Sequence, residues 1–133
     1  MSTKEEGITA KSPLLIIEDN FICQKIYVAA LRDYYPIELA STAEEATERL
    51  AEQTYQCIIS DLGLPDRPGI ELLPIIRNST LNQHTPIVVI SAHMSEELKQ
   101  ICLQLGANEV CVKPITAVIL REIIATLTRD QIF

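Results

Sequence analysis

Several residues able to bind a metal ion or a phosphoryl group directly follow short apolar runs. They are two adjacent acids, a further acid, a serine and a lysine: Glu18, Asp19, Asp61, Ser91 and Lys113. Runs rich in Ile, Val and Leu are typical of β-strands. If these strands are parallel, their carboxyl ends meet at one edge of a sheet, where ligands bind in open α/β folds. The five side chains would then converge on one crevice.

Three carboxylates in one crevice repel one another. Two unit charges about 4 Å apart, at an effective dielectric constant near 20, cost roughly 4 kcal/mol. A hard cation such as Mg²⁺, which takes oxygen ligands from carboxylates, water and phosphate, would offset that repulsion. Lys113 supplies a second positive charge. It could pair with the Asp61 carboxylate at rest and with a phosphoryl oxygen later.

This set of residues suits phosphoryl transfer to a carboxylate, because an aspartate can act as the nucleophile and form an aspartyl-phosphate. Such transfer depends mainly on positioning and charge neutralisation. A metal ion, Lys113 and the Ser91 hydroxyl could each contact a different phosphoryl oxygen. No histidine base or cysteine nucleophile is required.

The expected strands show near-continuous rather than alternating hydrophobicity, which is typical of strands buried on both faces of a parallel sheet. They cover residues 14–17, 37–40, 57–60, 87–90 and 110–112. Asn20 is a suitable cap for a helix running to about residue 34. In that helix Ile22, Ile26 and Ala29 fall on one face and predict its apolar side.

Four more helices are expected between and after the strands. A capping box beginning at Thr42 opens the second, with Ala43, Ala46 and Leu50 inward. Pro74 should make the third helix start late or kink, because proline lacks a backbone donor and crowds the preceding turn. The fourth and fifth show the i, i+3, i+4, i+7 pattern. Their apolar positions are Leu98, Ile101, Cys102 and Leu105, followed by Gly106 as a helix end, and Leu120, Ile123, Ile124 and Leu127.

Alternating strands and helices with right-handed crossovers predict an α/β fold of the flavodoxin-like, doubly wound kind. We expect a five-stranded parallel sheet of order 2-1-3-4-5 with helices on both faces. One domain, residues 13–130, should follow a flexible tail or linker at 1–12 and precede a short end at 131–133.

The composition limits the classes of partner and compartment. A net charge of −7 and a pI near 4.8 offer no basic surface for phosphates, so direct nucleic-acid binding is not expected and a protein partner is. No apolar run reaches the length of a membrane span. The cysteines lack C-x-x-C spacing, and Cys57 and Cys111 lie within apolar runs, which favours free thiols in the cytoplasm.

Four short motifs, in this order, carry a family resemblance. They are Glu18-Asp19-Asn20, Asp61 followed by Leu64-Pro65 and Gly69, Ser91-Ala92, and Lys113-Pro114. Over residues 13 to 128 the chain resembles the receiver domain of two-component response regulators and hybrid histidine kinases.

The resemblance implies a role for each matching residue. Asp61 would accept a phosphoryl group from a phosphohistidine of a histidine kinase or histidine phosphotransfer domain. Asp19, Asp61 and the backbone carbonyl of Gly63 would bind Mg²⁺ directly, and Glu18 would hold it through water. Ser91 and Lys113 would bind the phosphoryl group.

The same resemblance implies a response to phosphorylation. Movement of Ser91 and Lys113 would shift the fourth helix, fifth strand and fifth helix, the face expected to bind a downstream protein. Pro114 would follow a cis peptide bond, as in many family members.

Two positions depart from the family pattern. Val110 stands three residues before Lys113, where receivers often have an aromatic residue whose rotation accompanies the serine shift. Backbone and helix movement would therefore carry the signal. Gly63 and His93 stand two residues after Asp61 and Ser91, at positions that flank the attacking water. We hypothesise that His93 modulates the lifetime of the phosphoryl group while Gly63 leaves access open.

Two other functions remain open. A degenerate receiver would keep the fold and act as a constitutive protein-binding platform. A phosphatase of the haloacid-dehalogenase kind also forms an aspartyl-phosphate, but carries a second acid where this chain has Gly63. Asp66 and Arg67 are expected to be surface charges rather than ligands.

The module itself is not expected to be an enzyme beyond Mg²⁺-dependent phosphorylation and dephosphorylation of Asp61. The Glu-Asp-Asn start and the loop after Asp61 favour an origin in a hybrid kinase, of which it would be a cytosolic part.

Overall fold

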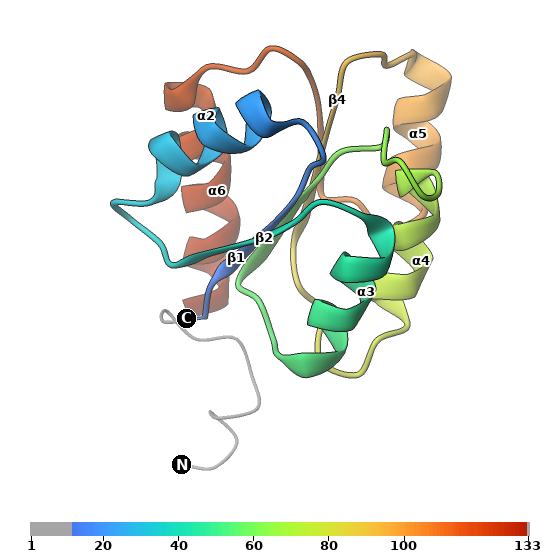
Figure 1. Cartoon of the computed structure of the whole chain (residues 1–133), viewed down its shortest axis with the longest axis horizontal. Helices are drawn as coiled ribbons and strands as arrows, with labels where there is room; N and C mark the ends of the chain where they lie inside the picture. Colours follow the sequence, from blue (N-terminus) through green and yellow to red (C-terminus); the bar gives the residue numbers. More distant parts are fainter. Residues whose placement is uncertain (1–11, 133) are drawn as a thin grey trace.

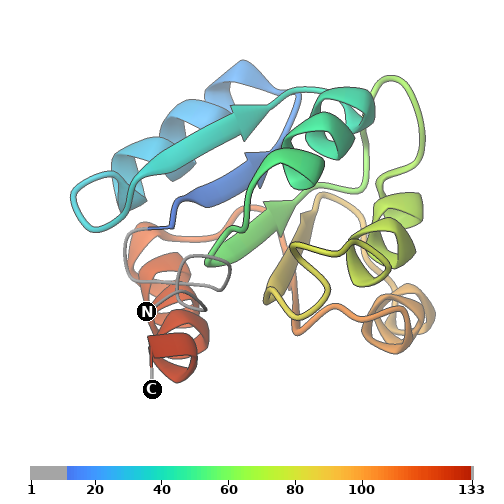
Figure 2. The ribbon, with the colours of Figure 1, turned by 90° about the horizontal axis from the view of Figure 1, so that it is seen from below.

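The computed structural model describes residues 12–132, and Figures 1 and 2 show a central sheet between two layers of helices. The elements in chain order are β1 Leu14–Ile17, α2 Phe21–Leu31, β2 Ile37–Ala40, α3 Ala43–Glu52, β3 Cys57–Ser60, a 3₁₀ turn Gly69–Glu71, α4 Leu72–Arg77, β4 Ile87–Ser91, α5 Glu96–Gln104, β5 Glu109–Val112 and α6 Ala117–Ile132. The expected N-terminal tail, apart from Ser12, lies outside the described residues. The last helix continues to Ile132, two residues past the expected domain boundary.

All neighbouring strands of the sheet are parallel, in the order β2-β1-β3-β4-β5. Ile17 at the end of β1 lies opposite both Ala40 and Ser60. Ser60 in turn lies opposite Val89 on β4. The carboxyl ends of the central strands are therefore nearly level. The predicted fold class and strand order are confirmed.

Each face of the sheet carries its own core. Leu15 and Ile17 of β1 pack in a cluster with residues of α3, α4 and α5. Leu14 and Ile16, which alternate with them, pack with residues of α2 and α6. Figure 2 shows the same division of helices between the two faces. All four β1 side chains are fully buried, as expected for a strand covered on both sides.

The predicted apolar face of α2 is wrong. Ile22 and Ile26 are 67% and 51% exposed, and Ala29 is exposed as well. The buried residues of this helix are Tyr27, Ala30 and Leu31. Because α2 is apolar around most of its circumference, its sequence offers two possible inward faces. Packing against β1 and α6 selects the one that contains Tyr27.

The other helices follow their predicted patterns except at Ile101 of α5, which was expected on the apolar face but is 39% exposed. Asn20 caps α2 through its side chain, and Ala43, Ala46 and Leu50 are the buried residues of α3. The segment containing Pro74 begins as a 3₁₀ turn and becomes α-helical only at Leu72, which places the proline in the first turn, where it is tolerated. Gly106 has φ +117° after α5, the conformation that favours glycine.

A buried asparagine connects three segments at the amino-terminal edge of the sheet. The Asn82 amide donates to the carbonyl oxygens of Leu50 and Gln53, at 3.0 and 2.9 Å. Its side-chain oxygen accepts from the backbone N–H of Tyr55 and from the hydroxyl of Thr85, both at 2.9 Å. Asn82 is fully buried, and all of these bonds except the partly buried one to Gln53 lie away from solvent.

Replacing Asn82 with Ala should destabilise the fold strongly. The substitution leaves buried polar groups unpaired, each at about 1–3 kcal/mol, so we expect the free energy of unfolding in urea to fall by more than about 2 kcal/mol. Gln83→Ala, at the exposed neighbouring position, is the matched control and should change it by less than about 0.5 kcal/mol. Equal stability of the two variants would contradict a structural role for the Asn82 network.

Candidate functional site

The carboxyl ends of β1 and β3 place two acids side by side. Asp61 follows β3, and its N–H donates to the Ile17 carbonyl of β1 at 3.0 Å. Glu18 follows β1, and its N–H donates to the Ala40 carbonyl of β2 at 2.9 Å. The hydrogen-bond ladder of the sheet therefore continues through the backbone N–H groups of both acidic residues.

Three carboxylates gather at this edge. One carboxylate oxygen from each of Glu18, Asp19 and Asp61 lies within 4.8 Å of the others. Glu18 is 1% exposed and Asp61 8%, whereas Asp19 is exposed. Two charges at that separation repel by about 3 kcal/mol at an effective dielectric constant of 20. The site therefore requires a compensating cation.

Lys113, which follows β5, provides that charge from the other side of the pocket. Its ammonium lies 3.0 Å from Glu18 Oε1 and 3.2 Å from Asp61 Oδ2. Burial would lower the pKa of Lys113, but hydrogen bonds and charge attraction from the two acids outweigh burial and raise that pKa. Burial raises the pKa of Glu18, and the hydrogen bond from Lys113 opposes this only in part. The lysine therefore stays protonated, and burial makes the charged form of Glu18 costly.

Ser91 ends β4, the neighbour of β3, and is 8% exposed. Its carbonyl accepts the backbone N–H of Lys113 at 2.9 Å, which couples the ends of β4 and β5. The Lys113-Pro114 peptide bond is cis, as expected. The structure thus brings Glu18, Asp19, Asp61 and Lys113 into one cluster, with Ser91 on the adjacent strand end.

The two positions that depart from the family pattern differ in their surroundings. Val110 pairs with Val89 across β5 and β4, and is partly buried against the core beneath α5. His93 is exposed in the β4–α5 loop, in a groove that also includes Met94, Leu98 and Val112. Gly63 is exposed too, and no heavy atom lies within 4 Å of the place where its Cβ would stand.

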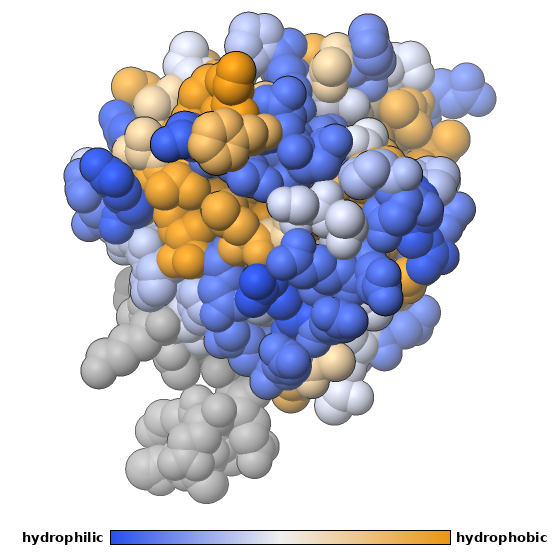
Figure 3. Space-filling model, viewed as in Figure 1, coloured by the Kyte–Doolittle hydropathy of each residue, from blue (hydrophilic) through white to orange (hydrophobic). Residues whose placement is uncertain are grey.

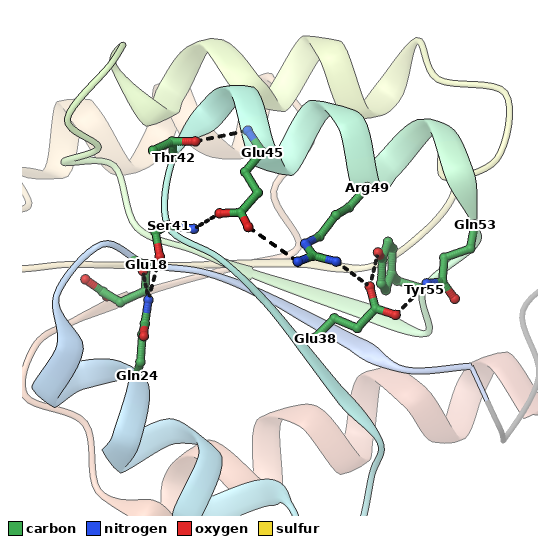
Figure 4. A network of polar contacts seen from close by, with 9 residues as sticks. All are labelled: Glu18, Gln24, Glu38, Ser41, Thr42, Glu45, Arg49, Gln53 and Tyr55. Atoms are coloured by element: carbon green, nitrogen blue, oxygen red, sulfur yellow. Dashed lines mark hydrogen bonds and ion pairs between the residues drawn. The ribbon is translucent and has the colours of Figure 1, made fainter.

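A polar network reaches Glu18 from the β2 side of the sheet (Figure 4). The amide of Gln24 on α2 donates to the Glu18 carbonyl and, at 3.1 Å, to the Ser41 hydroxyl. The Glu18 carboxylate also accepts the N–H of Asn20 at 3.1 Å. Sequence reasoning missed Gln24, because a glutamine within an amphipathic helix has no pattern that indicates its partner.

The loop after Asp61 contains two further residues whose roles sequence reasoning missed. Gly69 is buried, and a Cβ at this position would lie 2.3 Å from the Asp61 carbonyl oxygen, so the backbone there requires glycine. The Asp66 carboxylate accepts the N–H groups of Ala43 and Glu44 at the start of α3, both at 2.9 Å. Asp66 is exposed, as expected, but it is also a helix cap supplied from another segment.

The donor set fits a hard divalent cation. Carboxylate oxygens from three acids, two on neighbouring strand ends and one exposed to solvent, are the ligands that Mg²⁺ takes together with water. The Asp61 carboxylate also accepts the Gly63 N–H at 3.3 Å, which keeps the loop backbone beside the same group. The four cysteines are free thiols, and burial raises the pKa of Cys57 to about 12, which disfavours a thiolate ligand there.

Over residues 12–132, no helix has both the length and the apolar character needed to cross a membrane.

Solved structures with a similar fold include receiver domains of signalling proteins. The receiver domain of a Pseudomonas aeruginosa sensor histidine kinase, solved with magnesium in its active-site cleft, matches with a TM-score of 0.81 and 27% identity, over 90% of this chain and 99% of that one. The receiver domain of a putative Luxo repressor protein from Vibrio parahaemolyticus matches with a TM-score of 0.85 and 28% identity, over 91% and 92%.

Curated relatives include both response regulators and hybrid kinases. The transcriptional regulatory protein KdpE of Staphylococcus aureus is 38% identical over 122 residues, which are 90% of this chain and 51% of KdpE. Hybrid signal transduction histidine kinase B of Dictyostelium discoideum is 32% identical over 77% of this chain and 6% of the kinase. The chain thus spans about half of the first relative and a small part of the second.

The family model for the response regulator receiver domain matches residues 14–125, a span that begins at β1 and ends within α6 and so includes the whole acidic cluster, Ser91 and Lys113. On this match, together with the strand order and the pocket geometry, the chain belongs to the response regulator receiver domain family.

Proposed function

We propose that this domain is the phosphoacceptor module of a two-component phosphorelay and that Asp61 receives the phosphoryl group. The observation that supports this most strongly is the position of the Asp61 carboxylate. It lies at the carboxyl edge of the central strand, 3.2 Å from the Lys113 ammonium and within 4.8 Å of two other acids. A carboxylate held among opposite and like charges in this way can react as a nucleophile once a cation offsets the repulsion.

The proposed step transfers one phosphoryl group between two side chains. An Asp61 carboxylate oxygen attacks the phosphorus of a donor phosphohistidine, the new O–P bond forms, and the N–P bond breaks. The electron pair of that bond returns to the imidazole nitrogen, which takes up a proton. Positioning and charge compensation suffice for such a transfer. The donor would belong to a histidine kinase or a histidine phosphotransfer domain.

The surrounding residues take complementary roles in this proposal. Asp19, Asp61 and the Gly63 carbonyl would bind Mg²⁺ directly, and Glu18 would hold it through water. The ion would supply charge neutralisation for the phosphoryl oxygens. Lys113 would exchange its contact with Asp61 for one with a phosphoryl oxygen.

The proposed response to phosphorylation starts at Ser91 and Lys113. The Ser91 hydroxyl would approach the phosphoryl group, and the direct bond between the Ser91 carbonyl and the Lys113 N–H would move β4 and β5 together. Packing of Val110 against the core beneath α5 supports transmission through backbone and helix movement. The downstream partner would bind the α5–β5–α6 face, where Ile101, Val112 and Ile119 are 39%, 51% and 48% exposed.

A second apolar surface suits the phosphoryl donor. Figure 3 shows apolar side chains gathered on the side of the molecule that carries α2, while the α3 side is mainly hydrophilic. Phe21, Ile22 and Ile26 on this helix are exposed, and Phe21 begins the helix two residues after Asp19. A donor bound there would cover apolar surface and present its histidine at the edge of the pocket.

The alternatives rest on weaker support. A constitutive binding platform would not need Glu18, Asp19, Asp61 and Lys113 in contact distance. A phosphatase of the haloacid-dehalogenase kind would need a second acid at residue 63. The Glu18-Asp19-Asn20 segment and the loop after Asp61 favour a domain that is part of a hybrid kinase.

The assignment of Asp61 has a direct test. With acetyl phosphate or a phosphorylated histidine donor and Mg²⁺, the wild-type domain should acquire one acid-stable, base-labile phosphoryl group. Asp61→Asn should abolish the label, because an amide oxygen is a poor nucleophile, while Asp33→Asn, an exposed acid between α2 and β2, should retain it. Labelling that survives in Asp61→Asn would refute the assignment.

The resting role of Lys113 can be measured without phosphorylation. In EDTA at pH 7, Lys113→Met should lower the free energy of unfolding by about 1–3 kcal/mol, because two largely buried acids then lose their hydrogen-bond donor and face each other without the ammonium. Adding Asp61→Asn to Lys113→Met should restore part of that loss, since it removes one of the repelling charges. Wild-type stability of Lys113→Met in urea would contradict the proposed charge compensation.

The role of His93 concerns the lifetime of the phosphoryl group. If His93 restricts or orients the water that hydrolyses the aspartyl-phosphate, its replacement by Ala should change the decay rate by several-fold, on the order of 2- to 10-fold. Decay of phosphorylated wild type and His93→Ala would be followed after removal of the donor, with His84→Ala, the other exposed histidine, as control. Identical half-lives would remove His93 from the mechanism.

A further inference from the structure

The loop between β3 and the 3₁₀ turn, residues 62–68, passes beside the proposed pocket and is fixed near both of its ends. The side chain of Leu64 is buried in the core that contains Ala43 and Ala46 of α3. Where the loop ends, the Gly69 N–H donates to the Leu62 carbonyl at 2.8 Å. These contacts bring the loop back over the Asp61 backbone, which Gly69 approaches too closely for any other residue.

A further contact is made by Asp66, and it reaches a different element. Its two carboxylate oxygens accept the N–H groups of Ala43 and Glu44, one each, at 2.9 Å. Thr42 supplies the next cap of the same helix, because its hydroxyl accepts the Glu45 N–H at 3.0 Å (Figure 4). At the start of α3, Asp66 therefore accepts two of the N–H groups that have no partner within the helix, and Thr42 accepts a third.

Both contacts of Asp66 favour its charged form. The bonds from Ala43 and Glu44 lower the pKa of Asp66, and a carboxylate at a helix amino terminus also benefits from the helix dipole. Hydrogen bonds to a charged acceptor are stronger than those between neutral groups. Asp66 is exposed, so burial does not impose these contacts.

Gly63, by contrast, makes few contacts that could fix its own backbone. It is exposed, no heavy atom lies within 4 Å of its missing Cβ position, and its N–H bond to Asp61 is 3.3 Å long. Its backbone position therefore depends on the contacts that fix the loop on either side. The contact made by Asp66 lies three residues further along the chain.

We propose that Asp66 is a positioning residue for the phosphorylation pocket. By joining the loop to the first turn of α3, it fixes the Gly63 backbone and thereby raises the affinity of the site for Mg²⁺. This inference rests on the metal site of the proposed function, and it adds a link between α3 and the pocket. Movement of the first turn of α3 would then change metal affinity.

Two matched variants separate this role from ordinary helix capping. Thr42→Ala removes a cap from the same helix, at about 1 kcal/mol, and leaves the loop untouched. Arg67→Ala alters the adjacent loop residue, whose guanidinium pairs with Glu71 at 2.8 Å. The dissociation constant of Mg²⁺ would be measured by titration of the full chain, at a temperature where circular dichroism shows every variant folded.

Asp66→Ala should raise the dissociation constant for Mg²⁺ about 10-fold, the size of effect seen when groups that orient metal ligands are removed. Asp66→Asn, which keeps one suitable acceptor oxygen, should have a smaller effect in the same direction. Thr42→Ala and Arg67→Ala should stay within about twofold of wild type. A dissociation constant for Asp66→Ala equal to that of Thr42→Ala would overturn the proposal.

A second measurement needs no metal. In EDTA, amide hydrogen exchange at Gly63 should be faster in Asp66→Ala than in Thr42→Ala, because only the first variant frees the loop. Equal exchange in the two variants would overturn the proposal. If the wild type binds no Mg²⁺ at all, the metal site of the proposed function fails, while the exchange comparison still decides whether Asp66 holds the loop.

Discussion

The contact of one lysine with two buried acids is the interaction on which the pocket depends. Parallel strands bring Glu18 and Asp61 to the same edge of the sheet, and the backbone bonds that continue the ladder leave them no freedom to separate. Lys113 relieves the resulting repulsion from β5, at 3.0 and 3.2 Å from the two carboxylates. The two carboxylates are suitable ligands for a cation, and the Lys113 ammonium that offsets their repulsion is also suited to bind a phosphoryl oxygen.

That arrangement links the pocket to two other parts of the domain. Ser91 and Lys113 are joined through their backbones, and β5 lies at the edge of the sheet beside α5 and α6. Under the proposed function, a change in what Lys113 contacts would reach a face with several exposed apolar side chains. On the opposite flank, the loop after Asp61 is attached to α3 through Asp66. The first connection begins at Lys113, within the charged cluster, and the second begins in the loop that follows Asp61.

Sequence patterns predicted the strands, their order and most of the pocket. Local hydrophobicity indicates the strands, and the general rules for parallel α/β sheets then give their order and the edge at which the polar residues lie. Apolar runs mark buried parallel strands, and a polar residue after such a run must lie at the carboxyl edge. The inward face of α2 was predicted wrongly, since Ile22 and Tyr27 are both apolar and only packing against β1 and α6 distinguishes them. The contact of Asp66 with α3 could not be predicted, because it joins segments more than 20 residues apart that share no pattern.

The central claim is that the carboxylates at the ends of β1 and β3 form one pocket for Mg²⁺ and a phosphoryl group. The most direct test is a crystal structure of the domain with Mg²⁺ and beryllofluoride, which mimics a phosphoryl group on a carboxylate. Beryllofluoride should be bonded to an Asp61 oxygen and contacted by Lys113 and Ser91, with Mg²⁺ held by Asp19, Asp61 and the Gly63 carbonyl. A structure in which either group binds elsewhere, or in which Lys113 keeps its contact with Glu18 and Asp61 unchanged, would contradict the account.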